Sequence, residues 1–196
     1  MREKPFQSDS TRRHWMWIIG AAAFVRVLYF LWFLGSPLHG YYFADHLYYR
    51  NWGLEIASGD WFGQEVFEQG PLYAYLLGTA FRLGWSDTTI LVFQLFVGIG
   101  TSLLIYESAK RLFDLKIAFL AALLTAVYGP LIFYECMLMK SFLLPLLTTG
   151  VLYCSLRYQA SLRPGWLWIA GAQIGLACLI RENHLLYLIP LGCWVW

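Results

Sequence analysis

The stretch YYFADHLYYRNWGLEIASGDWFGQEVFEQGP, residues 41–71, is the longest polar interval between segments apolar enough to lie in lipid. It holds five of the twelve acidic residues of the chain, namely Asp45, Glu55, Asp60, Glu65 and Glu68. From Asp45 onward, aromatic and apolar residues recur at steps of three and four, which predicts a short amphipathic helix with Asp45 on its aromatic face. Gly59 is expected to end this helix. If the chain performs chemistry, we expect it here.

Composition places the chain among polytopic membrane proteins. Of its 196 residues, 59% are hydrophobic and 13% are charged, whereas soluble domains carry about 25% charged residues. Ten Trp and thirteen Tyr suit the membrane interfaces, because each side chain joins an apolar ring to a polar tip. The four cysteines form no CxxC or Cys/His cluster, and no GxGxxG, Walker, HExxH or GxSxG pattern is present. Zinc binding, nucleotide binding and serine hydrolysis therefore have no local support.

Six apolar segments are expected to form the membrane part of an all-α chain. They cover residues 15–34, 88–106, 117–133, 141–156, 166–180 and 185–196. The last has twelve residues, fewer than the roughly 20 that cross a bilayer, and is expected to be a truncated helix. Residues 1–196 are therefore predicted to be the N-terminal part of one transmembrane domain. Gly129-Pro130 predicts a kink in the third segment.

A long outer loop, residues 36–87, separates the first two segments. Within it, residues 71–83 are apolar but too short to span, so we expect a helix at the membrane interface. Pro71 suits the first position of that helix. Glu68 and Gln69 are expected to cap the helix or to contact a substrate.

Positive charges are distributed unequally between the two ends of the predicted bundle. The N-terminus and the two loops on its side carry nine Lys or Arg: Arg2, Lys4, Arg12, Arg13, Lys110, Arg111, Lys116, Arg157 and Arg163. The other side carries four: Arg50, Arg82, Lys140 and Arg181. The positive-inside rule therefore places the N-terminus in the cytoplasm. The outer loop and the turns at Glu135 and Arg181 are then expected to meet on the extracytoplasmic face.

Two carboxylates are the candidate catalytic groups. Asp45 is expected to act as a general base that takes the proton of an acceptor hydroxyl, or to be a helix N-cap. Glu135 is expected to orient the acceptor, to hold a divalent cation together with Asp45, or to change the pKa of the base. Alternatively, Glu135 pairs with Lys140. His39 and His46 give too weak a pattern for a metal site, so no metal ligand is assigned.

Three basic side chains are candidate binders of a phosphate. Arg26 lies inside the first apolar segment, where a charge is by default a functional-site hypothesis. It is expected to bind a phosphate oxygen, to pair with an outer carboxylate, or to extend to the interface. Lys140 and Arg181, at outer helix ends, are expected to hold a lipid-linked phosphate or to anchor their helices. Tyr48 and Tyr49, on the aromatic face of the short helix, complete the predicted substrate-binding set.

The order of these features resembles the membrane glycosyltransferases of the GT-C fold. A first span is followed by an outward loop with DHLYYRNWGLEIASGDW (residues 45–61) and then by VFEQGPLYAYLLG (residues 66–78). YGPLIFYECMLMK (residues 128–140) and LIREN (residues 179–183) stand where this family has polar residues of the outer face. More narrowly, the chain is similar to the bacterial branch related to protein O-mannosyltransferases and to the aminoarabinose transferases of lipid A.

The resemblance implies a GT-C-like helix bundle and the inverting transfer of a sugar. The donor would be a polyprenyl-phosphate sugar, and the acceptor a hydroxyl or phosphate of a protein, glycan or lipid. The resemblance also implies that Asp45 is the base, that Glu135 assists it, and that basic residues at outer helix ends hold the donor phosphate. The lipid bilayer is an expected partner, and nucleic acid is not.

Two other classes of function are compatible with the sequence. A transporter or channel normally places ionisable groups near the midplane of several helices, whereas only Arg26 lies clearly inside a span here. A sensor or assembly subunit would instead use the outer loop to bind a partner.

Overall fold

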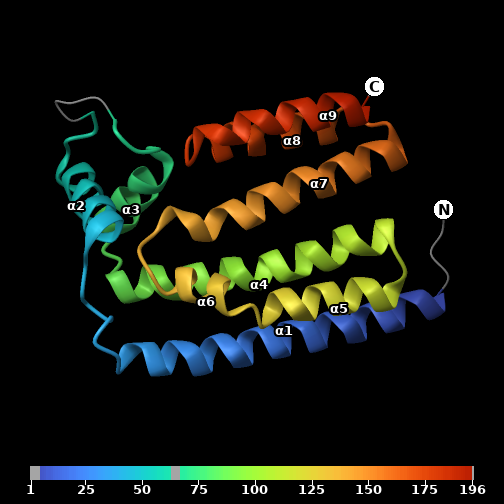
Figure 1. The fold of residues 1–196 in the computed structure, drawn as a ribbon, viewed down its shortest axis with the longest axis horizontal. Coiled ribbons are helices and arrows are strands. Elements are labelled where there is room, and N and C mark those ends of the chain that lie inside the picture. Colours follow the sequence, from blue (N-terminus) through green and yellow to red (C-terminus); the bar gives the residue numbers. More distant parts are fainter. Residues whose placement is uncertain (1–4, 63–66, 196) are drawn as a thin grey trace.

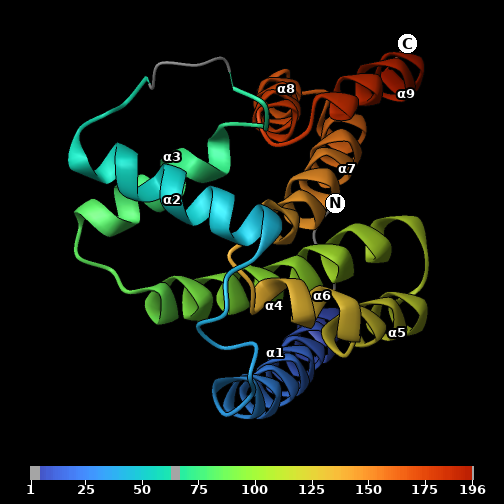
Figure 2. The same cartoon turned by 60° about the vertical axis from the view of Figure 1, so that its left-hand side comes forward.

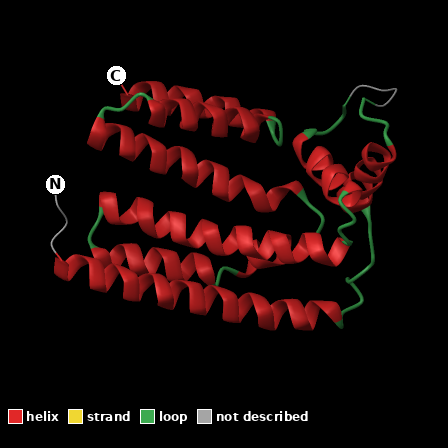
Figure 3. Ribbon diagram, turned by 180° about the vertical axis from the view of Figure 1, so that it is seen from behind, coloured by secondary structure: helices red, strands yellow, loops and turns green. Residues whose placement is uncertain are grey.

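The computed structural model describes residues 5–62 and 67–195, and the regular structure within these two ranges is helical throughout (Figure 3). The elements are, in order, α1 (Pro5–Leu34), α2 (Ala44–Ser58), α3 (Leu72–Arg82), α4 (Asp87–Leu112), α5 (Leu115–Ala126), α6 (Gly129–Glu135), η1 (Lys140–Phe142), α7 (Leu143–Ser161), α8 (Gly165–Cys178), η2 (Glu182–Tyr187) and α9 (Leu188–Val195). The predicted all-α class is therefore confirmed. Glu65 of the acidic interval and Trp196 of the last predicted segment lie outside the described residues.

The long helices lie side by side along the long axis of the molecule (Figure 1). α4 is central, because it contacts α1, α5 and α7, and α8 packs on the other side of α7. α2 and α3 pack against each other at one end of this bundle (Figure 2). The outer loop of the sequence thus folds into a helical hairpin beside the bundle.

The two ends of the bundle differ in their chemistry. The start of α1 and the α4–α5 and α7–α8 connections lie at one end, and α2, α3 and the turns after α6 and α8 lie at the other (Figure 1). Arg2 and Lys4 lie outside the described residues. The basic loops are therefore separated from the acidic interval, as the charge pattern predicts. The direction in which the bundle crosses a membrane stays a prediction.

Two helices in the described ranges, α1 and α4, are long and apolar enough to cross a membrane. α5 and α6 together form a third such segment, bent by 49°. Helices α7 and α8 are present where the fourth and fifth spans are predicted. By length and composition, however, neither is both long and apolar enough to qualify as a membrane span. Their crossing of the membrane also stays a prediction.

The predicted break in the third span is confirmed. α5 ends at Ala126 and α6 begins at Gly129. In an uninterrupted helix the carbonyl of Ala126 would accept a hydrogen bond from the N–H of residue 130, but Pro130 has no N–H. This carbonyl therefore needs another donor inside an apolar environment.

The α2–α3 hairpin has the aromatic face and the stop signal that the sequence predicts. α2 buries Tyr49, Trp52 and Ile56, which belong to the same apolar cluster as Leu77 of α3. It ends at Gly59, whose φ of 114° lies in the left-handed region that favours glycine. The hairpin is thus a packed unit that can hold polar side chains in fixed positions.

Close approach of α2 and α3 depends on two glycines. A Cβ at Gly53 would lie 2.7 Å from the Cβ of Leu77, and a Cβ at Gly78 would lie 2.5 Å from Cγ2 of Ile56. Both distances are shorter than van der Waals contact, so any side chain at these positions would separate the helices.

We expect Gly53→Ala to lower the free energy of unfolding by about 1–3 kcal/mol, because the added methyl group overpacks the hairpin. The matched control is Gly20→Ala in α1, where an added Cβ meets nothing within 4 Å, and alanine should stabilise the helix by up to about 1 kcal/mol. Thermal unfolding of the full-length protein in detergent measures both. Equal stability of the two variants would contradict the close packing.

Candidate active site at the end of the bundle

Three segments far apart in the sequence meet around Lys140. Its ammonium Nζ donates a hydrogen bond to Oε1 of Gln69 and lies 5.4 Å from the centroid of the Tyr49 ring. The hydroxyl of Tyr49 in turn donates to the carbonyl of Gly70, at 3.2 Å. The segment before α3, helix α2 and η1 therefore share one polar cluster.

The turn after α8 completes this cluster. The N–H of Leu72 donates to the carbonyl of Leu179 at 3.1 Å, and a Cβ at Gly70 would overlap the carbonyl oxygen of Ile180. Only glycine allows this approach. It brings Arg181, which is exposed, close enough for its positive charge to add to the larger effect of burial, which lowers the pKa of Lys140.

Asp45 lies in the first turn of α2, where a carboxylate interacts favourably with the unpaired N–H groups of the helix. It is not the N-cap: Phe43 has that position and makes no side-chain cap. The capping alternative is therefore wrong, because the helix begins earlier than that alternative requires. Ala44, directly before Asp45, has a φ of 44°, and such strain in a non-glycine residue is concentrated at functional sites.

The carboxylate of Asp45 is half-buried and, across residues 5–62 and 67–195, it has no hydrogen-bond or ion-pair partner. It nevertheless acts on its surroundings. After burial, which is the larger cause, the negative charge of Asp45 raises the pKa of Tyr49. It also raises the pKa of Lys140, against the larger effect of burial. The Asp45 carboxylate is thus near enough to influence the Lys140 ammonium electrostatically, although the two groups form no ion pair.

Lys140 is 7% exposed. Burial lowers the pKa of its ammonium; Asp45 raises this pKa, Arg181 lowers it and Glu182 raises it. Among the described residues no carboxylate forms an ion pair with Lys140, and its hydrogen-bond acceptor, Gln69, is neutral. A buried cation held by a neutral amide and an aromatic ring, without a counter-ion, is costly, and an incoming anion would compensate that cost.

Two predicted substrate-binding residues lie at the rim of the cluster. Tyr48 is 37% exposed and packs edge-on against Tyr49 and Trp52. Glu68 is exposed. Neither Glu68 nor Gln69 caps α3, whose N-cap is Pro71 and carries no side-chain cap bond, so the capping alternative is wrong for both.

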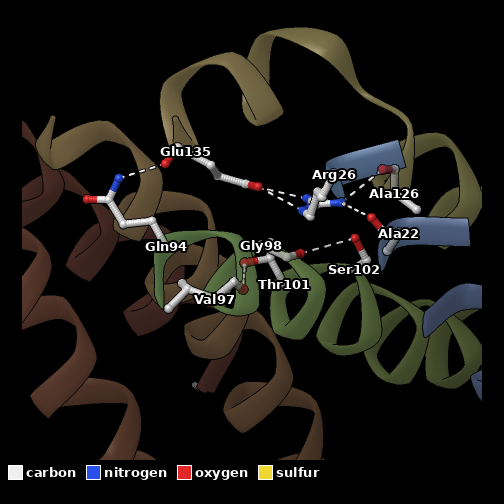
Figure 4. A network of polar contacts seen from close by, with 9 residues as sticks. All are labelled: Ala22, Arg26, Gln94, Val97, Gly98, Thr101, Ser102, Ala126 and Glu135. Carbon is white, nitrogen blue, oxygen red and sulfur yellow. Dashed lines mark hydrogen bonds and ion pairs between the residues drawn. The ribbon is translucent and has the colours of Figure 1, made fainter. Parts of the chain in front are cut away.

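Arg26 and Glu135 form a separate, fully buried ion pair between α1 and α6 (Figure 4). Nε of Arg26 lies 2.7 Å from Oε2 of Glu135, and its Nη2 lies 2.8 Å from Oε1. Nη1 of Arg26 donates to the carbonyl of Ala126 at 2.9 Å. This is the carbonyl that Pro130 leaves without a donor. Arg26 is 1% exposed and therefore does not extend to the interface.

Of the alternatives for these two residues, the structure shows the pairing of Arg26 with an outer carboxylate. The predicted pair of Glu135 with Lys140 is wrong, because both carboxylate oxygens of Glu135 are bonded to Arg26. The same bonds argue against a cation shared by Glu135 and Asp45. Within the described ranges no group of three or more His, Cys, Asp or Glu side chains is arranged to hold a metal.

Gln94, in α4, is a polar residue that the sequence reasoning missed. It is fully buried, its Nε2 donates to the carbonyls of Glu135 and Met137 at 2.8 Å each, and its Oε1 accepts from the Tyr73 hydroxyl at 2.6 Å. The available signal was an amide inside an apolar span, where a polar side chain needs a partner.

A further ion pair fixes α2 to the start of α4. Nε of Arg50 lies 2.9 Å from Oδ2 of Asp87, and the Tyr42 hydroxyl donates to the same oxygen at 2.5 Å. Burial, and then the bond to Asp87, raises the pKa of Tyr42 to about 12. This group holds the helix that carries Asp45 in place on the bundle.

The comparisons with known proteins agree with a membrane transferase. The family model described as "Dolichyl-phosphate-mannose-protein mannosyltransferase" matches residues 68–195. Searches of curated proteins and of solved structures gave no significant match.

We expect Arg26→Leu to lower the free energy of unfolding by about 3–5 kcal/mol, because it leaves the Glu135 carboxylate buried and unpaired. Arg26→Leu combined with Glu135→Leu should recover most of this loss, except for about 1–3 kcal/mol from the Ala126 carbonyl that remains without a donor. Denaturant unfolding of the full-length protein measures both.

The matched control for this pair is Lys110→Met. It removes the ion pair between Lys110 and Glu107, whose side chains are 16% and 17% exposed and lie one helical turn apart, so the expected loss is below about 1 kcal/mol. If Arg26→Leu were as stable as this control, Arg26 and Glu135 would not form the buried pair.

Proposed function

We propose that this chain, which belongs to the dolichyl-phosphate-mannose-protein mannosyltransferase family, transfers a sugar from a polyprenyl-phosphate donor to an acceptor hydroxyl or phosphate at the extracytoplasmic membrane face. The matched region contains Gln69, Lys140 and Arg181 and begins after Asp45. One observation carries the proposal: within the described part of the chain, an Asp45 carboxylate without a partner and a Lys140 ammonium without a counter-ion belong to the same cluster.

In the proposed reaction Asp45 is the general base. An acceptor oxygen attacks the anomeric carbon of the donor while its proton passes to the Asp45 carboxylate. The bond between the anomeric carbon and the phosphate oxygen breaks, and the lipid phosphate leaves with the electron pair. A single displacement of this kind inverts the anomeric centre. General-base catalysis is typically worth about 10²- to 10⁴-fold in rate.

Lys140 and Arg181 bind the donor phosphate in this proposal. The charge on the phosphate rises as the glycosidic bond breaks, so cations placed beforehand stabilise the leaving group more than the bound donor. Gln69 and Tyr49 hold Lys140, and Tyr48 and Glu68 lie where they can contact the sugar or acceptor. Arg26 and Glu135 support the site from the bundle interior, and neither is assigned a contact with substrate.

The placement of the site suits a lipid-linked donor. The cluster lies at the end of the bundle opposite the basic loops (Figure 1). Because the positive-inside rule predicts that the basic loops are cytoplasmic, the end with the cluster is expected outside the cytoplasm. A lipid phosphate lies at the surface of the bilayer, and an acceptor arrives from the aqueous side. A protein, a glycan or a lipid fits this geometry as the acceptor.

We expect Asp45→Asn in the full-length protein to keep the fold and the affinity for donor but to lower the transfer rate by about 10²- to 10⁴-fold. Release of labelled sugar from a polyprenyl-phosphate donor in detergent or vesicles measures the rate. The control is Glu55→Gln, an exposed carboxylate on the same helix, which should transfer at the parent rate. If the parent protein moves an intact solute, or only binds a partner, without consuming the donor, it is a transporter or a sensor.

A second prediction concerns the dependence of donor binding on pH. Lys140 binds an anion only while protonated, and burial sets its pKa below the ordinary value of 10.5. The KM for donor should therefore rise as the pH increases, with a midpoint below 10.5. Lys140→Arg stays charged over this range and should abolish the rise. A parent KM that does not change at alkaline pH would contradict the role of Lys140.

A further inference from the structure

Gln94 connects two segments that carry the polar cluster. On one side its amide nitrogen binds the carbonyls of Glu135 and Met137 (Figure 4 shows the bond to Glu135). These carbonyls belong to the turn that leads to Lys140. On the other side its amide oxygen accepts from Tyr73, which follows Gly70 by three residues. One fully buried side chain thus contacts both the turn before Lys140 and the helix that follows Gln69.

In the part of the chain that the structure describes, the carbonyls of the turn before Lys140 accept few other hydrogen bonds. Regular helix ends at Glu135 and resumes at η1. The Met137 carbonyl accepts from the N–H of Met139 at 2.7 Å, within the turn itself. Cys136 and Leu138 of this turn pack in the same apolar cluster as Leu91 and Leu95 of α4, and Gln94 adds hydrogen bonds from α4 to the backbone of the turn. From the opposite direction, the side chain of Glu135 is held by Arg26.

Aromatic packing follows the same geometry. The ring of Tyr73 lies 5.7 Å from that of Phe142, two residues after Lys140, and 5.4 Å from that of Tyr49. Tyr73 therefore contacts Tyr49, whose ring lies next to the Lys140 ammonium, and Phe142 of the same short helix as Lys140, while its hydroxyl is fixed by Gln94. A displacement of Tyr73 or of the turn would move Lys140 relative to Gln69.

We propose that Gln94 is a positioning residue for transfer: its amide holds the Lys140 ammonium against Gln69 and Tyr49, where the ammonium meets the donor phosphate. The inference rests on the proposed role of Lys140. Gln94 itself touches no substrate. It acts at a distance by fixing the turn from Glu135 to Met137 and the start of α3 in one arrangement.

The test is a double-mutant cycle in the full-length protein with Gln94→Leu and Lys140→Ala. Lys140→Ala should raise the KM for a labelled polyprenyl-phosphate sugar by about 10- to 100-fold, the loss of one charged contact. Gln94→Leu should raise it about tenfold in the parent. It should have little effect in the Lys140→Ala background, because no ammonium is left to position.

Two further variants separate positioning from general stability. Thr101→Val is the matched control: Thr101 is also fully buried in α4, but its hydroxyl donates to Val97 of the same helix, so donor KM should stay at the parent value. Tyr73→Phe removes only the hydroxyl that reaches Gln94 and should raise donor KM by about threefold, half the logarithmic effect of Gln94→Leu. This milder variant decides the question if Gln94→Leu does not fold.

A readout independent of rate is the alkaline midpoint of donor KM. Release of Lys140 from its buried position should move this midpoint upward toward 10.5, the ordinary pKa of lysine, in Gln94→Leu and in Tyr73→Phe. The inference is overturned if Gln94→Leu has the same effect on KM with and without Lys140, or has none. If Lys140→Ala itself leaves donor KM unchanged, the proposed phosphate contact fails first and the inference fails with it.

Discussion

A helix broken inside an apolar layer leaves backbone groups that water cannot reach, and this chain depends on how one such break is satisfied. Pro130 withholds the N–H that the Ala126 carbonyl would use, and Arg26 of α1 supplies the missing donor. The guanidinium is neutralised by Glu135 at the end of α6. A Cβ at Gly98 would overlap the Glu135 carboxylate, so the central helix is shaped to admit it. One break thereby joins α1, α4, α5 and α6.

The same arrangement gives the candidate site its electrostatic character. Glu135 forms its ion pair with Arg26, so Lys140, five residues later, has no acidic partner in the described structure. Asp87 likewise pairs with Arg50 and accepts from Tyr42, whereas Asp45 has no such partner among residues 5–62 and 67–195. The bundle uses Glu135 and Asp87, close to the site in sequence or in space, to hold helices together, and Asp45 stays available in the same cluster as a buried cation. This division between structural and available charges is what a site for an anionic donor and a proton-donating acceptor requires.

Local features of the sequence predicted local structure well. The aromatic helix around Asp45, its end at Gly59, the short apolar helix and the kink at Gly129-Pro130 follow from periodicity, glycine and proline, and each is present. Partners across the fold were harder to predict. Glu135 is near enough to Lys140 in sequence to suggest a salt bridge between them. Its actual partner, Arg26, is 109 positions away. Gln94 gave only the signal of a polar side chain within an apolar segment, which does not say what it contacts. The contact of Gly70 with the turn after α8 depends on tertiary approach, and the sequence pattern carries no trace of it.

The separation of Arg26 from Glu135 has a consequence for biosynthesis. Arg26 leaves the ribosome 109 residues before its partner, and the proline-broken helix that needs its N–H groups emerges only just ahead of Glu135. During that interval the first helix carries a cation without its counter-ion. Such a charge is more stable in contact with water or with another protein than in contact with lipid. We therefore expect α1 to settle in the bilayer only when α6 arrives, which would couple membrane insertion to tertiary folding in this part of the chain.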